Sequence, residues 1–109
     1  MNYEDETKLA ECSRQIQVYK TLTGGNNDWK KDAPNTECPL SVEEVAVWLY
    51  ELMEKSGVIL VDYARYIAYA NGISFKRLQK ARAAIGAEKD WFIDEDTYDR
   101  YRIWELPDE

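Results

Sequence analysis

Residues 71–86 read NGISFKRLQKARAAIG, and the two ends of this stretch mark the start and the end of a helix. Asn71-Gly72 is a turn signal, because glycine adopts a positive φ without steric cost. Ser74 is able to cap the helix start with its hydroxyl group, and Gly86 is typical of a helix end. The residues that recur at helical spacing between these limits predict one buried face: Phe75, Leu78, Ala81 and Ile85.

Two further helices are expected upstream of this one. Ser41 and Glu44 have the spacing of a capping box, in which each side chain accepts a hydrogen bond from an amide at the helix start. Residues 58–61 form a short apolar run rich in β-branched side chains, which favours a strand over a helix. We expect Asp62 to cap a second helix that continues through Ala70.

Two aromatic-rich segments near the C-terminus, at about residues 89–93 and 100–106, flank a polar loop and predict a β-hairpin. The expected order is therefore helix, short strand, helix, turn, helix and hairpin. Two helices joined by about four residues and followed by a hairpin define a winged helix-turn-helix. The expected fold class is mainly α with a small β-hairpin (α+β). We expect Trp48, Trp91 and Trp104 to lie in the core, where they tie the hairpin to the first helix of this unit.

Residues 1–40 are expected to form a helical arm and linker, and residues 41–109 the winged helix-turn-helix domain. The stretch after the arm helix is polar and broken by proline, which is typical of a linker, despite Trp29. An isolated helix with one apolar stripe is marginally stable in water. The arm is therefore expected to pack on its own domain or to pair with a partner protein or a second copy. The stripe that predicts a helix over about residues 5–22 consists of Leu9, Cys12, Ile16, Tyr19 and Leu22.

The composition excludes several kinds of site. Among 109 residues there is no histidine, so imidazole catalysis and histidine-ligated zinc are excluded. Two cysteines, Cys12 and Cys38, are too few for a four-cysteine zinc site. No phosphate-binding glycine loop is present. We therefore expect a non-enzymatic protein with no catalytic residue, metal or cofactor, and the lack of a signal peptide or membrane span favours a cytoplasmic location without a membrane partner.

Several motifs resemble a known family over roughly residues 42–107. They are similar to the C-terminal winged-helix segment of replication ATPases and primase–helicases of phages, plasmids and integrative elements. In that segment a Gly-Ile-Ser turn opens a helix, and the hairpin ends in Trp-x-Leu-Pro. The matching residues are Gly72-Ile73-Ser74, Leu78, Lys80, Ala81, Arg82, Ile85, Gly86 and Trp104-Glu105-Leu106-Pro107.

The chain also departs from that family. Arg77 stands where threonine is common, Ala87 replaces the usual valine, and the wing loop is acidic where the family's is commonly rich in glycine. No Walker motif is present. The resemblance therefore implies a fold and a mobile-element setting, and it does not imply ATP hydrolysis.

The predicted third helix presents cations and no anions between Ser74 and Ile85. DNA affinity arises largely from cations that replace counterions on phosphates, and a recognition helix enters the major groove. We predict a winged-helix accessory protein of a mobile genetic element that binds double-stranded DNA weakly, in replication or regulation. The residues expected to contact DNA are Ser74, Lys76, Arg77, Lys80 and Arg82 of the helix and Arg100 and Arg102 of the hairpin.

The overall charge supports an alternative function. The chain has a formal net charge of −7, and residues 41–109 carry nine cations against fourteen anions, so the predicted domain is itself acidic. An acidic wing tip would be repelled by phosphates. The alternative is an acidic, protein-binding winged helix that inhibits a partner or mimics DNA, for example a phage anti-defence protein. The residues expected to contact such a partner are Leu9, Ile16, Tyr19, Tyr66, Tyr69, Asp94, Glu95 and Asp96.

Overall fold

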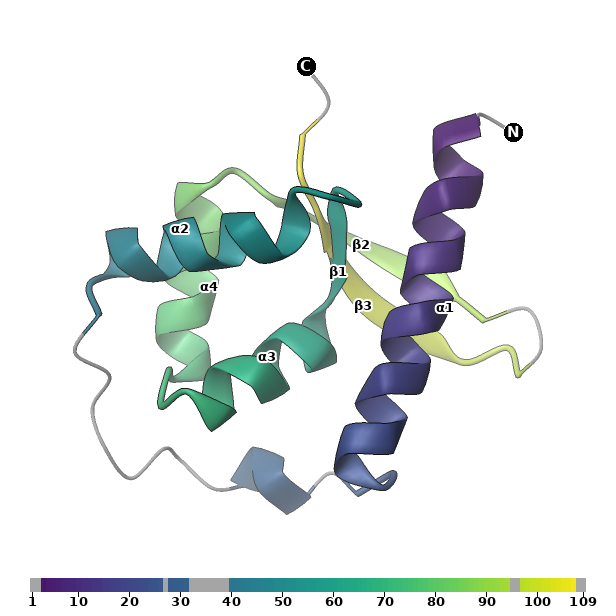
Figure 1. Ribbon diagram of the computed structural model, residues 1–109, viewed down its shortest axis with the longest axis horizontal. Coiled ribbons are helices and arrows are strands. Elements are labelled where there is room, and N and C mark those ends of the chain that lie inside the picture. Colours follow the sequence, from purple (N-terminus) through teal and green to yellow (C-terminus); the bar gives the residue numbers. More distant parts are fainter. Residues whose placement is uncertain (1–2, 27, 32–39, 95–96, 108–109) are drawn as a thin grey trace.

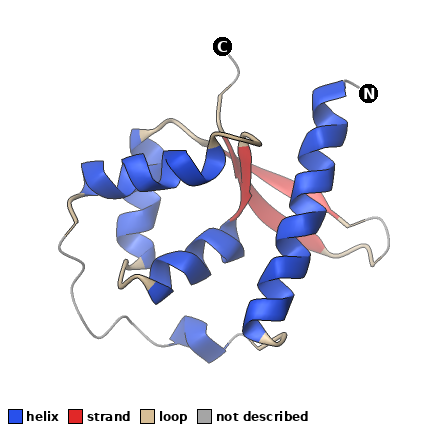
Figure 2. Ribbon diagram, viewed as in Figure 1, coloured by secondary structure: helices blue, strands red, loops and turns tan. Residues whose placement is uncertain are grey.

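The computed structural model describes residues 3–26, 28–31, 40–94 and 97–107, without the side chains of residues 3–7 and 31. Helices and a small antiparallel sheet alternate along this part of the chain, which confirms the predicted α+β class (Figure 2). The elements of Figure 1 are, in order, α1 (Tyr3–Thr23), the 3-10 helix η1 (Asp28–Lys31), α2 (Val42–Met53), β1 (Val58–Leu60), α3 (Val61–Ala70), α4 (Phe75–Ala84), β2 (Glu88–Ile93) and β3 (Arg100–Glu105).

The strands form one sheet in the order β1-β3-β2, and both pairings are antiparallel. Successive side chains of a strand point to opposite faces, so each face of this sheet has its own set of residues. Ile59 and Trp104 point to the face that packs against α2, α3 and α4. Leu60 and Ile103 point to the other face, which α1 covers (Figure 1). The sheet thus lies between two hydrophobic cores.

The starts of α2 and α4 are capped as predicted. The Ser41 hydroxyl accepts a hydrogen bond from the Glu44 amide, and the Glu44 carboxylate accepts from the Ser41 amide, which completes the capping box. The Ser74 hydroxyl accepts from the Arg77 amide at 3.2 Å. These caps fix two helices whose apolar faces meet in the larger core, where Leu49 and Leu78 are fully buried.

The prediction that Asp62 caps α3 is wrong. β1 runs directly into α3, so Leu60 occupies the cap position and makes no side-chain cap. Asp62 instead lies in the first turn of the helix, where a carboxylate interacts favourably with the helix dipole. Its Oδ1 atom is 2.9 Å from Lys30 Nζ, and this ion pair joins α3 to η1.

Trp29 is not part of an unstructured linker, because it lies in η1 and packs against α3. Its ring centroid is 5.2 Å from that of Tyr66, 5.7 Å from that of Tyr69 and 6.3 Å from that of Tyr19. The contacts with Tyr66 and Tyr19 are edge-to-face, and contacts of this kind contribute beyond the area they bury. The surrounding sequence is polar and broken by proline, so it does not indicate that Trp29 is packed. The partners of Trp29 lie in helices distant along the chain. Residues 32–39 of the predicted linker lie outside the described residues.

Helix α1 packs on its own chain through its apolar stripe. Cys12, Ile16 and Tyr19 are buried against the outer face of the sheet. This is one of the two arrangements that the sequence left open for the arm, and the division of the chain at residue 40 stays a prediction. No helix in the described ranges has the length and apolar character needed to cross a membrane.

Gln15 of α1 supplies the outer edge of the sheet with hydrogen bonds. Its Nε2 atom donates to the Val58 carbonyl at 3.2 Å, and its Oε1 atom accepts from the Leu60 amide at 2.6 Å. Because β1 is an edge strand, these two backbone groups have no neighbouring strand on that side. Gln15 is 2% exposed, and its side-chain amide therefore takes the place of a neighbouring strand.

The buried thiol of Cys12 makes the free energy of unfolding decrease as the pH rises in the alkaline range. Burial, together with the nearby charges of Glu105 and Glu11, raises the pKa of Cys12 from its ordinary value of 9.0 to about 11. The unfolded chain loses this proton near pH 9, whereas the folded chain keeps it until about pH 11. The stabilisation that comes from the protonated thiol is therefore intact below pH 9 and is lost as the pH rises through 11, by at most about 3 kcal/mol.

We expect urea-unfolding curves between pH 8 and pH 11 to show this loss and Cys12→Ala to reduce it. Burial also raises the pKa of Tyr19, so Tyr19→Phe is the control for the tyrosine part of the same alkaline loss. The relevant quantity is the slope of the unfolding free energy against pH, since Cys12→Ala also shifts the whole curve by a constant. An unchanged slope in Cys12→Ala would contradict the assignment.

Candidate nucleic-acid interface

The β2–β3 hairpin separates its charges by face. The register pairs Lys89 with Trp104, Trp91 with Arg102 and Ile93 with Arg100, so these side chains share the face on which Trp104 packs against the helices. The carboxylate-bearing residues of the two strands alternate onto the other face, and they are Glu88, Asp90 and Glu105. The hairpin face beside α4 is therefore cationic and aromatic, although the chain as a whole is acidic.

Helix α4, which lies next to this hairpin face, has two exposed lysines of its own. Lys76 and Lys80 are exposed one turn apart, and α4 contains no acidic residue. Within the described ranges, no carboxylate forms an ion pair with either lysine. We call the five exposed cations of α4 and the hairpin the basic face: Lys76, Lys80, Lys89, Arg100 and Arg102.

The other predicted DNA contacts of α4 serve the fold. Ser74 is occupied as the helix cap. The half-buried Arg77 donates from Nη1 to the Leu40 carbonyl at 2.9 Å, which fastens the start of α2 to α4. Arg82 donates from Nη1 to the Ala87 carbonyl at 2.7 Å, just beyond the end of the same helix. The sequence predicted DNA contacts for the two arginines because they are cations of a helix without acidic residues, but in the structure neighbouring backbone carbonyls accept hydrogen bonds from them.

Sequence reasoning missed Lys89. The position of Lys89 in the strand does not show whether its side chain lies near α4. Alternation puts every second residue on the same face, but it does not say which face adjoins the helix. The pairing of Lys89 with Trp104 decides this, because Trp104 is buried in the helical core. The sequence did contain a signal: along each strand the cations and the tryptophans are two positions apart, so they point to the same face.

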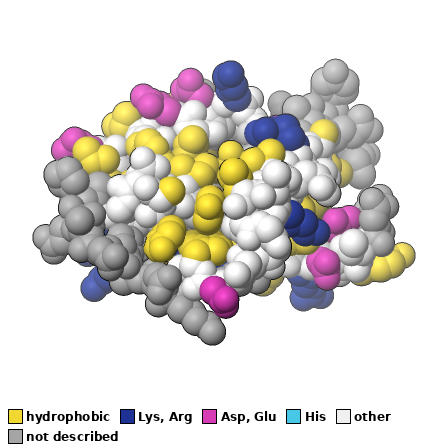
Figure 3. All heavy atoms as spheres, turned by 60° about the horizontal axis from the view of Figure 1, so that its bottom comes forward, with side chains coloured by type: hydrophobic (Ala, Val, Ile, Leu, Met, Phe, Trp, Pro, Cys, Tyr) yellow, Lys and Arg dark blue, Asp and Glu magenta, His cyan; other side chains and the backbone are white. Residues whose placement is uncertain are grey.

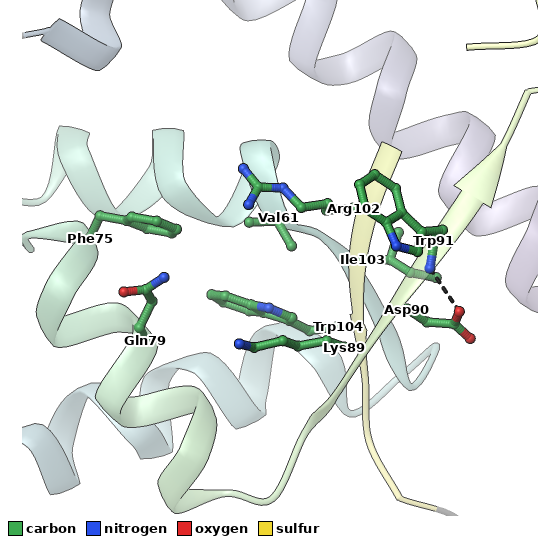
Figure 4. Close-up of a pocket in the computed structure, with 9 residues that line it drawn as sticks. All are labelled: Val61, Phe75, Gln79, Lys89, Asp90, Trp91, Arg102, Ile103 and Trp104. Carbon is green, nitrogen blue, oxygen red and sulfur yellow. Dashed lines mark hydrogen bonds between the residues drawn. The ribbon is translucent and has the colours of Figure 1, made fainter. Parts of the chain in front are cut away.

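A cleft of about 170 Å³ lies between α4 and the hairpin, on the basic face. Its residues are labelled in Figure 4, where Phe75 and Gln79 extend from the helical side and Trp104, Lys89 and Arg102 from the sheet. Asp90 also lies on its rim, with its Oδ1 atom accepting from the Trp91 amide at 2.8 Å. The cleft thus combines aromatic walls with cationic side chains.

Trp91 is not a core residue, contrary to the prediction. Trp104 is 3% exposed, but Trp91 is 58% exposed on the same face of the hairpin. The helices cover the part of the sheet nearest β1, where Trp104 pairs with Ile59, and Trp91 lies further along the hairpin. Trp48 is half-buried at the edge of the helical core.

Most of the residues of α1 and α3 that were predicted to bind a partner protein are buried or half-buried in the chain itself. Ile16 and Tyr19 are buried inside the chain, because the outer face of the sheet is apolar and takes up the stripe of α1. Leu9 is 38% exposed. Tyr66 and Tyr69 are half-buried against the ring of Trp29.

The end of the molecule that carries η1 has an apolar surface. Figure 3 turns this end forward and shows hydrophobic side chains gathered across the middle, with charged side chains around them. The half-buried rings of η1 and α3 belong to this end of the molecule, and the guanidinium of Arg65 lies 5.7 Å from the centroid of Trp29. This cluster stabilises the position of η1 on α3.

The hairpin tip has acidic side chains and a tight backbone. The Asp94 amide donates to the Asp99 carbonyl at 2.9 Å, and the Tyr98 amide donates to the Asp94 carbonyl at 2.7 Å. Tyr98 has a φ of 60° and is 82% exposed. Of the predicted partner contacts at this tip, Glu95 and Asp96 lie outside the described residues.

In comparisons with known proteins, no family model, no curated protein and no solved structure matches this chain.

Proposed function

We propose that this protein is a winged helix-turn-helix protein that binds double-stranded DNA through the basic face, as a non-enzymatic accessory of a mobile genetic element in replication or regulation. Its support begins with the topology. A helix, a short strand, two helices and a hairpin follow one another, and the short strand pairs with the hairpin. In a winged helix the second helix of the pair enters the major groove and the hairpin flanks it, and we propose these roles for α4 and for β2–β3.

The observation that carries the proposal is the sorting of charge. In a chain with 21 acidic and 14 basic residues, the surface formed by α4 and one hairpin face has five exposed cations, and no carboxylate side chain belongs to α4 or to that set of strand positions. Phosphate binding releases counterions in proportion to the cations that contact the backbone. Concentrating cations on one face gives an acidic protein a surface that attracts DNA locally.

The charges outside the basic face predict that DNA binding is weak. The net charge of −7 repels DNA at long range, and the exposed Asp99 near the hairpin tip acts at short range. Arg77 and Arg82 already bond backbone carbonyls. We therefore expect an affinity that is measurable at low salt and falls steeply as salt rises.

The test reverses two charges on the basic face and two elsewhere. Lys76→Glu with Lys80→Glu is expected to lower affinity for a mixed-sequence duplex at least about tenfold at low salt and to reduce the slope of log affinity against log salt by about 2. Lys20→Glu with Lys55→Glu is the matched control. These two lysines are also exposed, belong to neither α4 nor the hairpin, and change the net charge by the same amount.

Fluorescence anisotropy of a labelled duplex measures both variants across a salt series. Equal losses in the two double variants would show that only the total charge matters, which contradicts the assignment of the basic face. Absence of wild-type binding even at low salt would overturn the proposed function.

A second candidate function is favoured by the outer surface of α2. Val47 is 59% exposed and Tyr50 is 45% exposed, one turn apart, and exposed glutamates flank them at positions 43, 51 and 54. An apolar strip with an acidic rim suits an interface with a basic protein surface. If the duplex does not bind, the acidic, protein-binding winged helix becomes the better proposal.

A further inference from the structure

The basic face has one large aromatic side chain that the core does not use. Trp91 is 58% exposed and pairs across the hairpin with Arg102. In Figure 4 its ring lies next to Arg102 on the hairpin, and Phe75 lies across the cleft on α4. An exposed ring beside cations is the combination that single-stranded nucleic acid binds, because bases stack on the ring and phosphates approach the cations.

The cleft has the size and the chemistry for one nucleobase. A cavity of about 150 Å³ accommodates a benzene ring, and this cleft measures about 170 Å³. Phe75 and Trp104 supply flat apolar walls. Gln79, which extends from α4 toward the same space (Figure 4), offers an amide that both donates and accepts hydrogen bonds. Lys89 and Arg102 lie beside it and suit the phosphates on either side of a base.

A fully paired duplex would leave this part of the site unused. In a duplex the faces of each base are covered by its neighbours, so only base edges and the phosphate backbone are accessible to α4. A base stacks on a protein ring when it is unpaired and displaced from the helix. The cleft lies between the element that would contact a duplex groove, α4, and the cationic strands of the hairpin.

We infer that the protein prefers DNA in which a duplex continues into a single strand, with α4 on the duplex and one unpaired base stacked on Trp91 at the cleft that Phe75 and Trp104 line. This inference rests on the proposed function and adds to it the kind of DNA that is bound. It assigns to Trp91 a role in stacking, and to Gln79 a contact with the edge of the unpaired base.

The test compares three DNA molecules of identical duplex sequence at low salt. One is blunt, one has a short single-stranded thymine overhang, and one has an overhang of equal length made of abasic sites, which keeps the phosphates and removes the bases. The wild type is expected to bind the thymine overhang between about 5-fold and about 150-fold more tightly than the abasic one. Trp91→Ala is expected to remove this difference, and Trp91→Phe to retain part of it.

A second measurement does not depend on a variant. Stacking of a base on an exposed indole quenches its emission, so the thymine overhang is expected to quench the wild-type tryptophan fluorescence more than the abasic overhang does at equal saturation. Gln79→Ala, an exposed position on α4, is expected to weaken the preference for the thymine overhang over the abasic overhang.

The outcomes separate the two proposals. Equal, salt-dependent binding to all three molecules would overturn the inference about the unpaired base and leave the duplex-binding function intact. A thymine preference that survives in Trp91→Ala would also overturn it. Failure of the wild type to bind any of the three at low salt would overturn the proposed function itself.

Discussion

Replacement of Gln15 by leucine is expected to lower the free energy of unfolding by about 2–6 kcal/mol. Leucine is of similar size, so the packing of α1 on the sheet changes little. The loss arises because the Val58 carbonyl and the Leu60 amide, which now bond the Gln15 side chain, would be left in a buried environment without partners. Each orphaned backbone group costs about 1–3 kcal/mol.

The matched control is Gln17→Leu on the same helix. Gln17 is exposed, and a surface change of this kind typically stays within about 0.5 kcal/mol. Urea unfolding followed by circular dichroism measures both variants, and amide hydrogen exchange reports on the bond itself. The Leu60 amide is expected to be protected in the wild type and in Gln17→Leu, and to lose protection in Gln15→Leu. Equal stability of the two variants would show that the side chain is not needed to satisfy the edge of β1.

Local signals made most of the fold predictable. The capping residues Ser41, Glu44 and Ser74 act within one turn of their own helices, so their spacing in the sequence contains the whole interaction. The β-branched run predicted β1, and two aromatic-rich segments that flank a polar loop predicted the hairpin. The cap at Asp62 failed because the prediction needed a loop before α3, and the chain passes from strand to helix without one.

Contacts between distant segments were not predictable in the same way. Gln15 bonds backbone groups 43 and 45 residues away, and no periodicity of α1 indicates that a polar position on the helix faces an open strand edge. Trp29 has the same difficulty, since its partners are tyrosines of α1 and α3. Composition identified its surroundings as a linker, whereas the aromatic contacts fix η1 on the domain.

The sequence predicted the cations of the candidate site correctly where a side chain simply faces solvent. It failed where backbone carbonyls of the same chain bind the side chain. Lys76 and Lys80 followed from helical periodicity, because residues on the far side of an amphipathic helix face solvent. Arg77 and Arg82 were predicted to contact DNA as well, but they are half-buried and donate to the backbone carbonyls of Leu40 and Ala87. Lys89 required the strand register, which depends on pairing between β2 and β3.

The two tryptophans of the hairpin face are expected to give opposite results when they are replaced by alanine. Trp104 is 3% exposed and packs with residues of α2, α3 and α4, so Trp104→Ala is expected to cost about 3–5 kcal/mol of unfolding free energy. Trp91 is 58% exposed, so Trp91→Ala is expected to cost about 1 kcal/mol or less. Thermal and urea unfolding followed by circular dichroism compare the variants, which differ in position but not in chemistry.

Trp104→Phe serves as the milder variant, since the loss in Trp104→Ala is a large fraction of the 5–15 kcal/mol that usually separates folded from unfolded domains. A smaller ring leaves a smaller cavity, so its loss is expected to lie between those of the wild type and Trp104→Ala. Similar losses at both positions would mean that the face around Trp91 is covered in solution. Sharply different losses would mean that the indole of Trp91 is retained on the surface at little cost to the fold, which is the condition for a side chain whose partner is another molecule.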